Sequence, residues 1–229
     1  MQRIFPPSGH FIFLRRSRAT CGFTLVELLT VMAILAVMAG LVVPAVSGLG
    51  KSSELSSGAR MVSNMLASAR TEAITQRAVT RMAVVTDWPG EATADYRKMS
   101  IWQHDPAAAE PWKQIGAWTE LPRSVAFEPE SPAYVTGCDP ADYLLAGTQN
   151  SFTATIRGAT VTMKYAEFLP SGAARLPHAT GSEVWLALAP GQITDQSISY
   201  SVATTSGSPV NWAKISANTL TGRLRVSQP

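Results

Sequence analysis

A long apolar run near the start of the chain constrains its fold more than any other feature. From Phe23 to Leu49 the only charged residue is Glu27. About 20 apolar residues in a helix span the hydrocarbon core of a bilayer, so residues 23–49 are predicted to be a transmembrane helix. A carboxylate inside such a span is costly and marks a functional position. If the chain were cut after Gly22, the new amino group of Phe23 would lie one helical turn from Glu27 and could neutralise it.

The segment before the apolar run is basic. Residues 1–22 contain four arginines and no acid, and basic residues beside a span hold that end in the cytoplasm. A secretory signal peptide would be cut after its apolar segment, next to small residues. The sequence therefore places the N-terminal end of the span on the cytoplasmic side.

The segment Gly22-Phe23-Thr24-Leu25-Val26-Glu27, followed by an apolar helix, resembles the N-terminus of type IV prepilins and type II secretion pseudopilins. The resemblance implies that residues 1–22 are a leader peptide, that a prepilin peptidase cleaves between Gly22 and Phe23, and that Phe23 is then N-methylated. It also implies that Glu27 guides a new subunit into a helical filament.

Pro44 lies inside the apolar run, four residues after Gly40. Proline removes a backbone donor and crowds the carbonyl of the preceding turn, so a helix kink is expected at Pro44. Related pilins often have a proline at this depth. Two interpretations remain open: a flexible joint used in assembly, or a proline that the membrane helix tolerates.

Residues 50–77 are predicted to continue the helix in amphipathic form. Small and apolar residues recur there at steps of three and four, which is typical of one buried helix face. One long helix from about residue 23 to residue 76 is expected, or two helices hinged near residues 48–58. The predicted stripe consists of Leu55, Ala59, Val62, Leu66, Ala69 and Ala73.

Residues 78–229 have the pattern of a β-rich globular domain. Short alternating runs are separated by Pro- and Gly-containing turns, and residues 104–112 and 128–151 are expected to be loops. A helix followed by strands predicts an α+β fold with an antiparallel sheet against the helix. The expected strands are 79–86, 98–103, 114–120, 124–127, 160–168, 183–189, 197–202, 212–217 and 223–226.

Three short segments, in their order along the chain, point to one family among the pilin-like proteins. Residues 69–74 (Ala-Arg-Thr-Glu-Ala-Ile), 168–172 (Phe-Leu-Pro-Ser-Gly) and 220–226 (Leu-Thr-Gly-Arg-Leu-Arg-Val) are similar to segments of the GspH/FimT family of minor pseudopilins and pilins. Residues 87–150 are longer and richer in Pro and Trp than that family leads us to expect. This region suggests a variant such as the pilin-like Verru_Chthon cassette protein D group. The six tryptophans all follow residue 87, and they are expected in the core or on sheet faces, with a sugar- or partner-binding patch as the alternative.

The charge distribution bears on a nucleic-acid partner. The whole chain has a net charge of +3, and loss of the leader with its four arginines leaves −1. Because the chain without its leader has no overall excess of basic residues, it is not expected to bind DNA by pairing basic side chains with the phosphates. Some FimT-type minor pilins capture DNA through a C-terminal Gly-Arg-x-Arg motif, which 222–225 match. A DNA-binding site at the C-terminus would use Lys214, Arg223 and Arg225. The favoured interpretation is an ordinary final strand whose arginines point outward.

No enzyme chemistry is expected. Neither His104 nor His178 lies in a nucleophile motif, and no phosphate-binding glycine loop or zinc-spaced Cys/His pair occurs in the sequence. Cys21 would leave with the leader, so Cys138 would remain alone and no internal disulfide is available. No cofactor and no metal site are predicted.

The resemblance as a whole implies a minor pilin or pseudopilin, a structural subunit of a type II secretion pseudopilus or type IV pilus. Its expected partners are a prepilin peptidase, other pilins or pseudopilins, and the lipid of the inner membrane, while nucleic acid is not favoured. The expected location is the inner (cytoplasmic) membrane of a Gram-negative cell, with one span and a periplasmic C-terminal domain. DNA capture for uptake is the alternative function.

Overall fold

The computed structural model describes residues 23–229 except 109, 178, 195–196 and 203, and it leaves the side chains of residues 40–51 and 93 undescribed. The chain divides into two compact units, one ending at Pro44 and the other covering Ala45–Pro229. Both units contain part of one long helix, and all strands formed by the described residues lie in the second unit. The second unit is therefore the β-rich domain.

Helix α1 spans Leu25–Gln76, and its backbone is helical throughout the range in which a hinge was the alternative. Arg77 has a φ of 51°, the left-handed conformation that commonly follows the last turn of a helix. Six side chains on the C-terminal half of α1 are at most 3% exposed, and they form one stripe. These residues are Leu55, Ala59, Val62, Leu66, Ala69 and Ala73, so the predicted buried face is confirmed.

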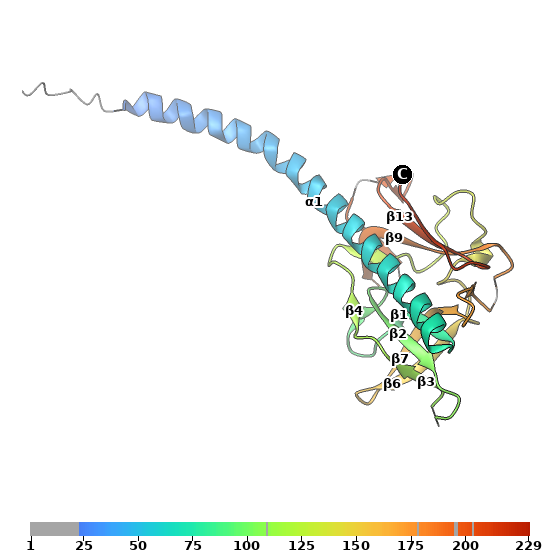
Figure 1. The fold of residues 1–229 in the computed structure, drawn as a ribbon. Helices are drawn as coiled ribbons and strands as arrows, with labels where there is room; N and C mark the ends of the chain where they lie inside the picture. Colours follow the sequence, from blue (N-terminus) through green and yellow to red (C-terminus); the bar gives the residue numbers. More distant parts are fainter. Residues whose placement is uncertain (1–22, 109, 178, 195–196, 203) are drawn as a thin grey trace, which may run out of the picture. The chain divides into compact units, whose positions relative to one another are not determined.

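Seven strands form an antiparallel sheet in the order β3-β2-β1-β7-β6, with β4 also paired to β2 and β8 to β7 (Figure 1). The β6–β7 hairpin turns on Arg157 and Gly158, which both have positive φ, and this matches the right-handed twist of paired strands. The strands are β1 (Thr80–Asp87), β2 (Lys98–His104), β3 (Trp112–Gln114), β4 (Thr119–Glu120), β6 (Ser151–Ile156), β7 (Ala159–Phe168) and β8 (Ala174–Arg175).

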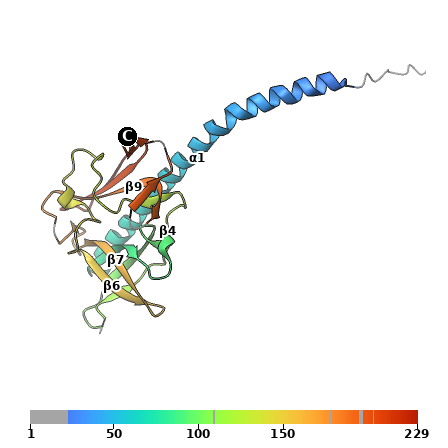
Figure 2. The same cartoon turned by 180° about the vertical axis from the view of Figure 1, so that it is seen from behind.

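A second antiparallel sheet has the order β10-β9-β13-β14, with β5 paired to β9. Strand β9 of this sheet is labelled in Figure 2. A separate two-stranded hairpin joins β11 to β12, and two short 3-10 helices lie in the loops. The elements are β5 (Val125–Phe127), β9 (Glu183–Thr194), β10 (Ser197–Tyr200), β11 (Thr204–Thr205), β12 (Ser208–Pro209), β13 (Ala213–Asn218), β14 (Leu224–Ser227), η1 (Ala92–Ala94) and η2 (Pro140–Asp142).

The main core lies between α1 and the two sheets. Met82 and Val84 of β1 pack with the α1 stripe, as do Leu186 and Leu188 of β9. Because side chains alternate along a strand, Ala83 and Val85 of β1 face the other way and belong to a second apolar cluster. The predicted α+β class, with antiparallel sheets against a long helix, is confirmed.

One predicted strand was wrong, and β6, β8, β11 and β12 were not predicted. Residues 114–120 do not form one strand, because β3 ends at Gln114 and the chain leaves the sheet edge before β4 begins at Thr119. The amide groups of Ile115 and Gly116 both bond to the carbonyl of Ile101, which turns the backbone at this point. Strand β6 was not predicted, although its residues alternate in burial along its whole length.

The three short segments that resemble the GspH/FimT family meet at Arg70. The Arg70 guanidinium donates from Nε to the carbonyl oxygen of Gly172, 3.1 Å away. Gly172 and Gly222 both have positive φ, at 82° and 62°. A Cβ at Gly222 would overlap the Gly172 carbonyl oxygen and lie 2.7 Å from Arg70 Nε. The two turns, which are far apart in sequence, are therefore packed backbone to backbone, and the Arg70 side chain joins them to the helix.

Candidate functional site

The first turn of α1 holds Thr24 and Glu27 in a reciprocal cap. The amide of Glu27 donates to Thr24 Oγ1 at 3.2 Å, and the amide of Thr24 donates to Glu27 Oε2 at 3.5 Å. This is a capping box, in which two free amide groups at a helix start are satisfied by each other's side chains. Sequence reasoning assigned Glu27 only to assembly, although the Thr-x-x-Glu spacing also predicts this cap.

The surface that follows this cap is apolar and exposed. Phe23 is 78% exposed, and ten further large apolar side chains as far as Met38 are 48–75% exposed. Fully burying one such side chain stabilises a structure by about 1.5–3 kcal/mol. Contiguous apolar surface of this extent is a site for lipid or for another protein chain.

Several predicted features of this segment lie outside the described residues. The leader 1–22, including Gly22, is among them, and so is the Pro44 side chain. Within the described part of the chain, no helix has the length and apolar character needed to cross a membrane. Side chains 40–51, which make up much of the predicted span 23–49, are not described.

Comparison with family models identifies the N-terminal segment. Residues 17–43 match the model described as the prokaryotic N-terminal methylation motif. The chain carries this methylation motif. The match includes Gly22, Phe23 and Glu27, so the resemblance noted from the sequence is confirmed for the N-terminal segment, and the chain is pilin-like there. The matched range ends one residue before Pro44.

The comparisons with solved structures and with curated proteins give less information than the family model. The minor pseudopilin EpsH from the type 2 secretion system of Vibrio cholerae matches with a TM-score of 0.41 and 15% identity, over 77% of this chain and 98% of that one. None of the curated proteins compared matches the chain.

The three C-terminal basic residues do not form one exposed group. Arg223 and Arg225 are exposed, and the register of β13 with β14 places Arg225 opposite Ser216. Lys214 is half-buried, with its Nζ 3.7 Å from Glu183 Oε2 and 2.9 Å from Cys138 Sγ. The expected inward side of the last strand is only partly buried, because Val226 is 45% exposed.

Replacing both Arg223 and Arg225 by glutamine should change the free energy of unfolding by no more than about 0.5 kcal/mol, because both side chains are exposed. We expect neither the parent chain nor the double variant to bind duplex DNA in the micromolar range at physiological salt. The measurement is a titration of the full chain with DNA over a salt series. Micromolar binding that disappears in the double variant, with a salt slope lowered by about one unit per lost contact, would contradict this expectation.

A second cluster of titratable groups surrounds Glu128, which is 4% exposed and follows β5. The Tyr134 hydroxyl donates to the Glu128 carboxylate, and the Tyr143 hydroxyl donates to its backbone carbonyl at 2.6 Å. Burial raises the pKa of Glu128, against the hydrogen bonds from Tyr134 and Tyr200. Burial and then the Glu128 charge raise the pKa of Tyr200 to about 12.

Glu128→Gln should therefore become more stable relative to the unchanged protein as pH rises. The folded-state pKa of Glu128 lies above the reference value of 4.5. Its contribution to stability is thus fully present below that value and is lost as pH rises through the folded-state pKa. Urea unfolding at pH 4 and pH 8 measures the difference, and Glu130→Gln, at a nearby exposed acid, is the control. A difference between Glu128→Gln and the parent that is the same at both pH values would contradict the prediction.

Within the described residues, no three His, Cys, Asp or Glu side chains lie close enough together to hold a metal ion. Asp142 is buried, and its Oδ1 accepts hydrogen bonds from the amides of Thr180 and Gly181. Asp142 therefore anchors one loop to another.

Proposed function

We propose that the chain is a minor pilin or pseudopilin, a structural rather than enzymatic subunit of a type II secretion pseudopilus or type IV pilus of the GspH/FimT kind. A prepilin peptidase would remove residues 1–22 and methylate Phe23. The remaining helix would anchor the protein in the inner membrane, with the β-rich domain on the periplasmic side, until it joins other pilins in a filament.

The methylation motif at the start of an exposed apolar helix is the observation that carries this proposal. The matched residues include Phe23 and Glu27, and Glu27 lies in the first turn of α1, which begins at Leu25. The exposed side chains that follow have apolar surface that only lipid or neighbouring helices would cover. An anchor of this kind serves first in the membrane and then in the centre of a filament.

The charge of Glu27 gives this proposal a specific test. Cleavage would turn the Phe23 nitrogen, part of a peptide bond in the full chain, into an ammonium group. An ion pair between that ammonium and the Glu27 of a neighbouring chain would fix the register of two helices in a medium where unpaired charges are costly.

Glu27→Gln should insert normally but enter filaments much less than the parent chain. Glutamine at this position still supports a capping box, so the helix start is kept while the charge is lost. Crosslinking to partner pilins in cells measures incorporation. Glu72→Gln, which removes an acid near the other end of α1, should incorporate like the parent. Equal incorporation of Glu27→Gln and the parent would remove Glu27 from the assembly mechanism.

A further inference from the structure

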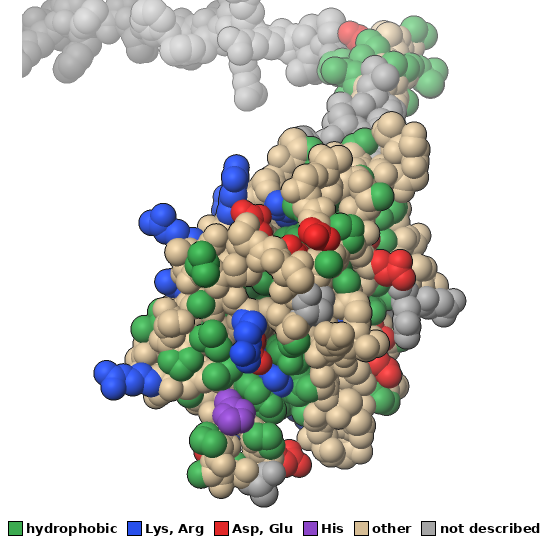
Figure 3. All heavy atoms as spheres, turned by 90° about the vertical axis from the view of Figure 1, so that its right-hand side faces the viewer, with side chains coloured by type: hydrophobic (Ala, Val, Ile, Leu, Met, Phe, Trp, Pro, Cys, Tyr) green, Lys and Arg blue, Asp and Glu red, His purple; other side chains and the backbone are tan. Residues whose placement is uncertain are grey.

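Aromatic side chains gather on the face of the seven-stranded sheet opposite α1. Their ring centroids lie close together: 5.3 Å between Trp88 and Trp118, 5.5 Å between Trp102 and Phe152, and 6.4 Å between Trp112 and Phe152. Figure 3 shows the region around the histidine, where hydrophobic side chains gather with Lys and Arg beside them. We call Trp88, Trp102, Trp112, Trp118, Phe152 and Tyr165 the outer aromatic cluster.

Part of this cluster is held in place by charge. The Arg81 guanidinium carbon lies 3.5 Å from the ring centroid of Trp112 and 3.6 Å from that of Tyr165. Glu167, which is 3% exposed, pairs with Arg81 at 3.1 Å. A guanidinium between two rings and a buried carboxylate fix the Trp112 indole before any ligand arrives.

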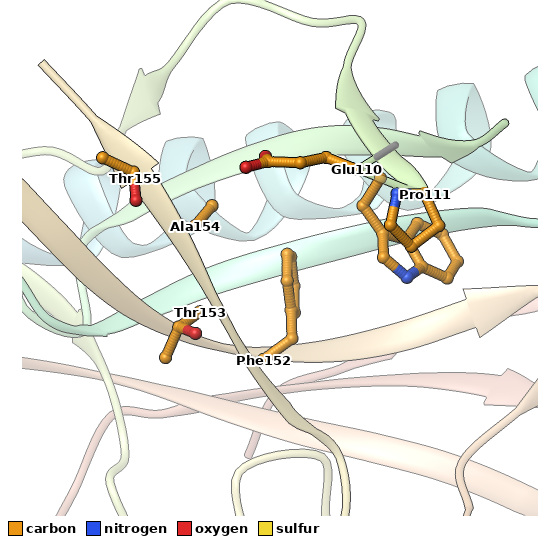
Figure 4. A pocket seen from close by; sticks show the side chains of 7 residues that line it. Glu110, Pro111, Phe152, Thr153, Ala154 and Thr155 are labelled. Atoms are coloured by element: carbon orange, nitrogen blue, oxygen red, sulfur yellow. The ribbon is translucent and has the colours of Figure 1, made fainter. Parts of the chain in front are cut away.

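A cavity of about 530 Å³ opens between the two edge strands β3 and β6 (Figure 4). Residues 110–112 line one side, and residues 152–155 of β6 line the other. The Phe152 ring points into this space, and the Glu110 side chain extends across it. Glu110 has no ion pair or hydrogen bond to the described part of the chain, and its carboxylate is exposed.

A second cavity, of about 520 Å³, lies between the same two edges, where Gln114 ends β3 and Ile156 ends β6. The sheet order separates β3 and β6 by four antiparallel steps, so the two strands run in the same direction, and the cavities follow one another along them. The second cavity contains Trp88 and Trp118 together with Glu91, Lys98, Gln114 and Arg157. Both cavities thus combine aromatic rings with a carboxylate and other hydrogen-bonding groups.

This combination suits a neutral, hydroxyl-rich ligand. Ring faces are apolar and carry partial negative charge, so they pack well against the C–H groups of a sugar ring. Carboxylate, amide and hydroxyl groups at the rim match sugar hydroxyls as donors and acceptors. Each cavity has the size of a small-molecule site. The first cavity is lined by one acid and no base. In the second, the Lys98 ammonium is paired with Glu91 at 2.6 Å, which leaves the single charge of Arg157. One such cation offers little to a polyanion, so a neutral ligand is favoured.

We propose that the seam between β3 and β6 binds a neutral oligosaccharide, with sugar rings on Trp112 and Phe152 in one cavity and on Trp88 and Trp118 in the other. The Glu110 carboxylate accepts hydrogen bonds from sugar hydroxyls. This role does not depend on the methylation motif, because every residue involved lies in the β-rich domain.

Calorimetric titration of the full chain with cellohexaose, chitohexaose and maltohexaose tests the proposal, in a detergent without a sugar headgroup. At least one of these neutral hexasaccharides should bind saturably. Trp112→Ala should weaken that binding about tenfold or more, which is the size expected for losing an aromatic contact. Trp212→Ala is the matched control, because Trp212 packs on Tyr134 with ring centroids 5.9 Å apart and lines neither cavity.

Three further variants keep the test decisive if Trp112→Ala does not fold. Trp112→Phe retains a ring and should bind more tightly than Trp112→Leu, and Glu110→Gln should weaken binding without changing the unfolding temperature. Absence of binding by all three sugars at millimolar concentration would overturn the proposal. So would binding that Trp112→Leu and Glu110→Gln leave unchanged.

Discussion

Gly222→Ala is expected to lower the free energy of unfolding by about 3–5 kcal/mol, more than most single substitutions. Gly222 has a φ of 62°, in the left-handed region where a side chain is strained. The added methyl group would also overlap the backbone carbonyl of Gly172. Because that atom belongs to the backbone of a tight turn, it cannot move without displacing the turn from Arg70.

A matched control separates the two causes. Gly207 has a φ of 81°, but a Cβ there meets no atom within 4 Å. Gly207→Ala therefore carries the backbone strain alone, about 1–2 kcal/mol. Urea unfolding of the three proteins measures both effects. If Gly222→Ala loses no more stability than Gly207→Ala, the close approach of the two turns to Arg70 is not what Gly222 provides.

Gly22→Arg is expected to abolish processing by a prepilin peptidase. The resemblance at the N-terminus implies a cut between Gly22 and Phe23, and a site that takes glycine at this position has no room for a long charged side chain. The variant should keep its leader and fail to enter filaments, because its Phe23 nitrogen stays in a peptide bond.

Ser17→Arg is the control for charge, since it adds the same side chain to the leader five residues before the proposed cut. It should be processed like the parent chain, as judged by the mass of the intact protein. Normal processing of Gly22→Arg would show that Gly22 does not define the cut site.

The helix could be predicted from sequence because its pattern is local. The six stripe residues repeat at three- and four-residue steps, and all six are buried against the sheets. The N-terminal motif could be recognised for the same reason, since its specified residues are consecutive. Most strands were also predicted, because β-branched and apolar residues alternate between turns that contain Pro or Gly.

The remaining features depend on contacts between distant segments. Nothing local in residues 114–120 shows that the chain leaves the sheet after Gln114, since Ile101 on another strand causes that turn. From the sequence, Lys214 was grouped with Arg223 and Arg225 as a basic residue that could contact DNA. In the structure its ammonium instead contacts the side chains of Glu183 and Cys138. The seam between β3 and β6 joins two segments about 40 residues apart that share no sequence signal.

The mass of the N-terminal peptide shows whether the chain is processed as a prepilin. The full chain is expressed with and without a prepilin peptidase, and the membrane fraction is analysed by mass spectrometry. We expect the peptidase to remove residues 1–22 and to leave methylated Phe23 as the new N-terminus. An intact leader in the presence of active peptidase, or a cut after residue 49, would contradict this expectation.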